Sequence, residues 1–236
     1  MSFIITVYTN EGIVMASDSR STGSSVQRLP DGRTQTLLGT QITDTTYKTF
    51  KCNERIGLST CGDASINQIP IAGYIENFIH EKVTAESTVE HIAADALSYF
   101  TALCPTLSTH FIIAGYNPGS SFPTVYHVRT ECKTIINVPT TPPNYIWDGE
   151  ILTVVKLLQP VYMQNQDGSF YPLQNYGVNF NFFNLQDAIN FAQYAVDVTI
   201  KTMAFENCVK TVGGPVDILV IKPTESFWVA RKELHA

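Results

Sequence analysis

MSFIITVYTNEGIVMASDSR, residues 1–20, is the stretch that decides the fold. Residues 3–8 are rich in β-branched and aromatic side chains, residues 9–12 read as a turn, and residues 13–16 form a second apolar run. The pattern predicts a β-hairpin that starts almost at the first residue. Since its opening strand would be paired in a sheet, we expect Ser2 to be held in place, unlike most residues near a chain end.

Ser2 would be the first residue of the chain if Met1 were removed. It would then carry a nucleophilic hydroxyl and a free α-amine. An α-amine has a pKa of about 7.7 to 8, against about 10.4 for a lysine, so it accepts a proton near neutral pH. The sequence therefore predicts a serine that supplies its own general base. The alternative is an ordinary Met-Ser terminus without a chemical role.

Two further motifs lie in register with Ser2. The return strand of the hairpin reads Gly-Ile-Val-Met-Ala-Ser-Asp-Ser-Arg at 12–20, and Lys48 precedes an apolar strand that ends at Gly62. These motifs resemble those of the proteasome β-type subunits of the N-terminal nucleophile (Ntn) hydrolases, including the 14-residue step from Lys48 to Gly62. Weaker similarities at 112–118 and 213–221 extend the resemblance over nearly the whole chain. It implies a single proteasome-subunit-like domain, 1–236, with no appended module.

The resemblance implies an α+β fold, the four-layer αββα sandwich of two antiparallel sheets flanked by helices. The pattern along the chain agrees, with strands at both ends and helices in two blocks. Apolar periodicity and capping residues predict helices after Gly62, from 87 to Pro105, over 150–159 and from Asn184 to Met203. By contrast, the segment 22–46 is rich in Ser, Thr, Gly and Gln, and we expect a long irregular insertion there.

The resemblance also assigns roles to individual residues. Ser2 would be both nucleophile and base, and Lys48 would keep the α-amine neutral because a nearby positive charge disfavours its protonation. A partly buried lysine needs a carboxylate partner, which the family pattern places at Asp18. The backbone N–H of Gly62 would stabilise the oxyanion. Arg20 would be a structural partner that holds the end of the sheet.

The chain departs from the family pattern in three places. The nucleophile is Ser where the family usually has Thr, so the methyl group that restrains the side chain is missing. The segment 209–214 has Val209 and Val212 where the family has polar residues that support the amine. Asp148 falls where the family has a Ser; it would hydrogen-bond the Ser2 amine but also favour its protonated form. These departures resemble the bacterial proteasome-related branch of the Anbu type.

Composition excludes several classes of protein. A formal charge of −6 with only isolated basic residues argues against a nucleic-acid surface, and no stretch approaches the roughly 20 apolar residues of a membrane span. With no signal-peptide pattern, we expect a cytoplasmic protein. The 5 cysteines are scattered without C-x-x-C spacing, and the 5 histidines show no metal-ligand spacing. We therefore expect neither a disulfide framework nor a metal or other cofactor.

Two functions from different classes remain open. The first is an N-terminal-serine amide hydrolase, a threonine-type-like endopeptidase that acts on peptides or unfolded proteins within a self-compartmentalising homo-oligomer, with an unfoldase as a candidate partner. The second is a catalytically silent assembly subunit with the same fold. A small-amide Ntn hydrolase is a third alternative, since the same chemistry occurs on non-peptide substrates.

Overall fold

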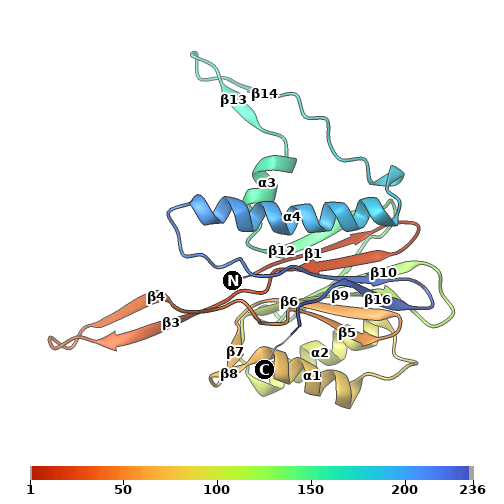
Figure 1. Ribbon diagram of the computed structural model, residues 1–236, viewed down its shortest axis with the longest axis horizontal. Coiled ribbons are helices and arrows are strands. Elements are labelled where there is room, and N and C mark those ends of the chain that lie inside the picture. Colours follow the sequence, from red (N-terminus) through yellow and green to blue (C-terminus); the bar gives the residue numbers. More distant parts are fainter. Residues whose placement is uncertain (1, 234–236) are drawn as a thin grey trace.

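The computed structural model describes residues 2–233, and two five-stranded antiparallel sheets form its centre (Figure 1). The first sheet has the order β12-β1-β2-β15-β16 and the second the order β11-β10-β9-β6-β5. The strands of the first sheet are β1 Phe3–Tyr8, β2 Ile13–Ser17, β12 Asn144–Gly149, β15 Asp217–Ile221 and β16 Ser226–Ala230. Those of the second are β5 Thr49–Asn53, β6 Ile56–Gly62, β9 Thr109–Tyr116, β10 Pro123–Arg129 and β11 Thr134–Val138.

The N-terminal hairpin is formed as the sequence predicts. Strands β1 and β2 pair from Ile4 opposite Ser17 to Tyr8 opposite Ile13. The Thr9 N–H donates to the Gly12 carbonyl at 2.9 Å and closes the turn between them. Both strands are buried along their whole length because β12 and β15 flank the hairpin and the two faces of the sheet are covered.

The two sheets pack face to face through an apolar layer. Ile4, Met15 and Leu219 of the first sheet share one buried cluster with Ile112 and Ala114 of the second. A Cβ atom on Gly57 would lie 2.8 Å from the Met15 sulfur and 2.9 Å from Leu219. The sheets approach so closely at this point that any larger residue would displace the side chains of Met15 and Leu219.

Helices cover the outer faces of both sheets (Figure 1). Helices α1 Ile71–Lys82 and α2 Val89–Leu103 lie against the second sheet, and α3 Leu152–Leu158 and α4 Leu185–Phe205 lie against the first. Helix α4 starts with a capping box in which the Asn184 side chain accepts the Asp187 N–H and Asp187 accepts the Asn184 N–H. The prediction of an α+β fold with antiparallel sheets is confirmed.

The segment 22–46 differs from the prediction. It forms a two-stranded hairpin, β3 Ser21–Arg28 and β4 Thr34–Thr43, that projects from the body of the molecule (Figure 1). The ribbon is rich in Ser, Thr and Gln and has few apolar side chains. Neither of its faces is buried in a core, so a strand here does not need them. The remaining short elements are β7 Ser65–Ile66, β8 Ile69–Pro70, β13 Tyr162–Gln164, β14 Phe170–Pro172 and the 3₁₀ helix Phe180–Phe182.

Candidate active site

A buried ion pair lies at the end of the hairpin. Asp18 directly follows β2, and Lys48 directly precedes β5, so one residue comes from each sheet. The Lys48 Nζ is 2.7 Å from Asp18 Oδ1, with side-chain exposures of 3% and 0%. The partner that the sequence predicts for Lys48 is therefore in contact with it.

The Asp18 carboxylate also gathers backbone groups from three segments. Its Oδ1 accepts the N–H of Phe3 at 3.0 Å, and its Oδ2 accepts those of Arg20 and Gly213, each at 3.0 Å. Every hydrogen bond to an ionised carboxylate offsets part of the cost of its burial. Through the Phe3 amide, the carboxylate fixes the start of β1 next to Lys48.

Lys48 has one further partner, the Arg20 carbonyl, which accepts from its Nζ at 2.5 Å. Burial lowers the pKa of Lys48, while the charge of Asp18 works in the opposite direction. Lys48 thus lies in a site that excludes water, where a charge acts strongly on its neighbours.

Ser2 is 7% exposed and immediately precedes β1. Its carbonyl accepts the Glu150 N–H at 2.7 Å. Gly149 has φ +88°, and a Cβ atom there would lie 1.9 Å from the Ser2 oxygen, so only glycine fits. Ser2 is therefore held from both sides, by the amide of the residue after it and by the turn at 149–150. Met1 lies outside the described residues, and its removal stays a prediction.

Gly62 ends β6 with φ +110°. A Cβ atom on it would lie 2.4 Å from the Ser108 carbonyl oxygen and 2.9 Å from Thr109 Cα. The structure thus explains why the residue is glycine. The oxyanion role of its N–H stays a prediction.

Arg20 lies at the base of the β3–β4 hairpin. Its guanidinium donates to both carboxylate oxygens of Asp44, at 2.7 and 2.8 Å, and joins the residues on either side of the hairpin. A Cβ atom on Gly213 would lie 2.5 Å from Arg20 Cζ, so the guanidinium packs directly on that glycine. This geometry agrees with a structural role for Arg20.

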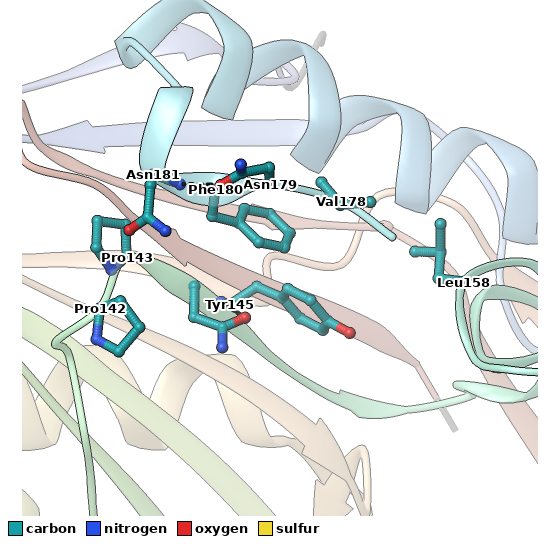
Figure 2. Close-up of a pocket in the computed structure, with 9 residues that line it drawn as sticks. Pro142, Pro143, Tyr145, Leu158, Val178, Asn179, Phe180 and Asn181 are labelled. Carbon is teal, nitrogen blue, oxygen red and sulfur yellow. Dashed lines mark hydrogen bonds between the residues drawn. The ribbon is translucent and has the colours of Figure 1, made fainter. Parts of the chain in front are cut away.

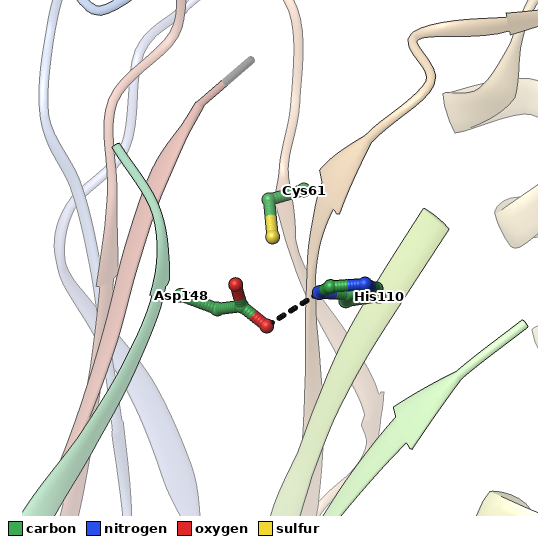
Figure 3. A group of neighbouring side chains, drawn as sticks. All are labelled: Cys61, His110 and Asp148. Carbon is green, nitrogen blue, oxygen red and sulfur yellow. Dashed lines mark hydrogen bonds and ion pairs between the residues drawn. The ribbon is translucent and has the colours of Figure 1, made fainter. Parts of the chain in front are cut away.

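Asp148 is bound by two histidines that the sequence analysis left without a role. Its Oδ2 lies 2.6 Å from His110 Nδ1 and 2.5 Å from His127 Nε2, and its Oδ1 accepts the Gly149 N–H at 2.6 Å. Figure 3 shows Asp148 and His110 beside the thiol of Cys61. The carboxylate is thus engaged by these rings; its predicted contact with the Ser2 amine stays a prediction.

The spacing of these residues along the chain does not predict this cluster, but the pairing of the strands does. Cys61 pairs directly with His110 across β6 and β9, and His127 pairs with Ile112 across β10 and β9. Because side chains two residues apart in a strand share a face, the three side chains lie on one face of the second sheet. That face is opposite β12, which carries Asp148.

The two valines that depart from the family pattern differ in environment. Val212 is 1% exposed and belongs to the core beneath α4. Val209 is 36% exposed, and its side chain would meet a Cβ atom on Gly39 at 2.8 Å. Neither offers a hydrogen bond to a terminal amine.

Two hollows in the surface differ in their relation to Ser2. One adjoins the site, because its lining includes Glu150, whose N–H binds the Ser2 carbonyl, and Thr211, which precedes Val212. The other lies beside Tyr145 and Phe180, between Pro142 and Leu158 (Figure 2). Tyr145 is at the opposite end of β12 from Gly149, so this second pocket is not part of the site.

Comparisons with known proteins identify the fold. No family model and no curated protein matches the sequence. Among solved structures, Anbu from Hyphomicrobium sp. strain MC1 matches with a TM-score of 0.62 at 16% identity, over 98% of this chain and 88% of that one. A (Gly-1) mutant of the same protein matches with a TM-score of 0.62 at 15% identity, over 98% and 87%. The chain therefore has an Anbu-like fold, as its resemblance to the proteasome-related proteins predicts.

Proposed function

We propose that the chain is an N-terminal-serine amide hydrolase, and that its two sheets and covering helices are the four-layer αββα sandwich of the Ntn hydrolases. One observation supports this most strongly. The Asp18 carboxylate binds the Phe3 amide and the Lys48 ammonium through the same oxygen, so the start of β1 and the buried cation are held together. An ion pair with a purely structural role would not require a hydrogen bond to the backbone of Phe3, the residue next to Ser2.

In the proposed reaction, removal of Met1 frees the α-amine of Ser2. The Ser2 Oγ attacks an amide carbonyl while the α-amine takes its proton and later returns it to the leaving amine. Lys48 keeps the amine neutral by charge repulsion, and the Gly62 N–H stabilises the oxyanion. Water then hydrolyses the acyl-serine ester.

The hollow beside Glu150 supports a peptide as substrate. Its lining combines apolar side chains such as Leu152 and Met203 with the hydroxyl residues Thr22 and Thr211. An extended chain with mixed side chains suits such a surface better than a small charged amide does. A homo-oligomer that encloses the sites, and an unfoldase that delivers substrate, are parts of the same proposal.

A specific observation favours the second candidate, a catalytically silent assembly subunit. Val212 is packed in the core and Val209 is apolar, so neither supports an amine as the family's polar residues do. The two candidates share the fold and the buried ion pair. They differ in whether the Ser2 amine is free and reactive.

Intact mass after treatment with a peptide epoxyketone tests the proposal, because this electrophile requires both a hydroxyl and a free amine on the nucleophile. We expect the untreated protein to lack Met1 and the treated protein to gain one adduct per chain. The Ser2→Ala variant should gain none, while Ser19→Ala, at a buried hydroxyl bonded to the Pro215 carbonyl, should still gain one. Retained Met1, or a processed chain without adduct, would overturn the hydrolase and support the silent subunit.

A further inference from the structure

Four side chains that the proposed hydrolysis does not use converge between the two sheets. We call Cys61, His110, His127 and Asp148 the intersheet cluster. The first three come from β6, β9 and β10 of the second sheet, and Asp148 comes from β12 of the first. All four have side-chain atoms that bind transition metals: a thiol, two imidazoles and a carboxylate.

The donor atoms are close together. Asp148 Oδ2 lies 2.6 Å from His110 Nδ1 and 2.5 Å from His127 Nε2. Donor atoms of Cys61, His110 and Asp148 all lie within 4.8 Å of one another. Figure 3 shows the Cys61 sulfur directed toward the same space as the Asp148 carboxylate and the His110 ring. One ion could reach these three groups, and the Nε2 of His127 lies beside them at 2.5 Å from the Asp148 carboxylate.

We propose that the intersheet cluster binds a zinc ion. A tetrahedral zinc lies about 2.0 to 2.3 Å from its ligands, so its donor atoms are about 3.3 to 3.8 Å apart. The two nitrogen–oxygen contacts, 2.6 and 2.5 Å in the structure, therefore open by about 0.7 to 1 Å on binding. Rotation of the side chains would provide this change.

The outer contacts of the cluster are those of a metal site. The Nε2 of His110 lies 2.8 Å from Glu131 Oε1, and Asp148 Oδ1 accepts the Gly149 N–H. A histidine that binds a metal through one nitrogen usually donates its other N–H to a carboxylate or carbonyl, which fixes the ring and its tautomer. Glu131 is placed to do this when Nδ1 of His110 binds the ion.

Charge balance also favours a divalent cation. Binding releases the Cys61 proton and requires each imidazole in the neutral form with its proton on the nitrogen that faces away from the ion, Nε2 of His110 and Nδ1 of His127; the ion is then surrounded by a thiolate, a carboxylate and two neutral imidazoles. Two negative ligands then neutralise the 2+ charge of zinc. A neutral complex suits this region, where Cys61 is 4% exposed and His127 is similarly buried.

The site would act on the backbone next to Ser2. Cys61 precedes Gly62, the proposed oxyanion residue, and Asp148 precedes Gly149, which packs on the Ser2 carbonyl. A zinc ion held by both residues would fix both glycines at once and join the two sheets. It would be a structural ion beside the active site and would take no part in the attack on the substrate.

Cobalt substitution tests the zinc site without reference to hydrolysis. Apo protein titrated with Co²⁺ should reach one ion per chain and show the intense near-ultraviolet absorption of a thiolate–cobalt bond, which zinc then displaces. Cys61→Ser should abolish this band, and His127→Gln should weaken cobalt binding at least tenfold. Cys52→Ser is the matched control, since Cys52 is a thiol on the neighbouring strand β5 outside the intersheet cluster, and it should bind as the wild type does.

Two outcomes would overturn the proposal. One is wild-type protein that binds no cobalt at micromolar concentration; the other is a band of equal strength in Cys61→Ser. If Cys61→Ser fails to fold, the loss of affinity in His127→Gln assigns the band to the cluster, and a wild type without a band still overturns the proposal. Ser2→Ala should keep the band unchanged, so failure of the hydrolase proposal and failure of the zinc proposal are separate results.

Discussion

Lys48 Nζ and Phe3 N share one acceptor, Asp18 Oδ1, at 2.7 and 3.0 Å. A single buried carboxylate thus ties the first strand, the residue after the second strand and the residue before β5 into one unit. The N-terminal hairpin and the lysine of the second sheet cannot move independently while this oxygen is ionised and bound.

Asp18→Asn should destabilise the protein by about 3 to 5 kcal/mol, because it leaves the Lys48 charge buried without a counter-ion. Urea unfolding followed by circular dichroism measures the loss. Asp197→Asn is the control: Asp197 lies 3.9 Å from Lys201 on the surface of α4, and its loss should have little effect. Equal stability of Asp18→Asn and wild type would show that Lys48 is not charged in the folded protein.

Two glycine-to-alanine substitutions should have opposite effects. Gly62→Ala places a Cβ atom 2.4 Å from the Ser108 oxygen at φ +110°, and we expect a loss of about 2 kcal/mol or more. Gly73→Ala, in helix α1 with open space around it, should stabilise by about 0.5 to 1 kcal/mol. Melting temperatures of the pair give the comparison. If Gly62→Ala melted as high as wild type, β6 would have to end differently from the structure described.

The Arg20–Asp44 pair should give a stability that depends on pH. The hydrogen bond from Arg20 is the main cause of a lowered pKa for Asp44, against some opposition from burial. A carboxyl whose pKa is depressed by folding stabilises the protein above its unfolded pKa of about 3.9, and that contribution is lost as the pH falls through the lower folded value.

Asp44→Asn should therefore melt below wild type at pH 6, and the difference should shrink as the pH falls below about 4. Thermal melts of both proteins between pH 6 and pH 2.5 measure it. A difference that stayed constant over this range would show that Asp44 acts through packing or hydrogen bonding and not through its charge.

Asn184→Ala should cost about 1 kcal/mol, because it removes the side chain that caps α4 and half of the capping box with Asp187. Asn190→Ala is the matched control on the exposed face of the same helix, where alanine is the better helix former. Chemical denaturation of the two variants should separate them clearly. Similar stabilities would mean that helix packing alone fixes the start of α4.

The sequence predicts the helices and strands in which a regular pattern of apolar residues marks the buried face. The hairpin of β1 and β2 follows from apolar runs on either side of a turn, and α4 follows from Asn184 and an apolar stripe. The start of α1 at Ile71 agrees with Pro70, which bends or delays a helix. These signals are local, so one sequence is enough to read them.

The elements that sequence reasoning missed depend on contacts between distant segments. The β3–β4 ribbon pairs through backbone hydrogen bonds and carries few apolar side chains, so its composition resembles that of a loop. His110 and His127 are brought together by the pairing of β9 with β10, and Asp148 meets them because the first sheet packs on the second. Ligand spacing identifies sites within a loop or helix, and the intersheet cluster draws each member from a different strand.

Asp148 is on the first sheet and its two histidines are on the second. The distances within this cluster therefore depend on the separation of the two sheets. Ile112→Ala would leave a cavity in the apolar layer that also contains Met15, and the sheets could then move closer together or slide past each other. The distances from Asp148 to His110 and His127 would change with that separation, and so would the turn at Gly149. We therefore expect substitutions in the core, far from Ser2, to change the position of Ser2 by changing the separation of the sheets.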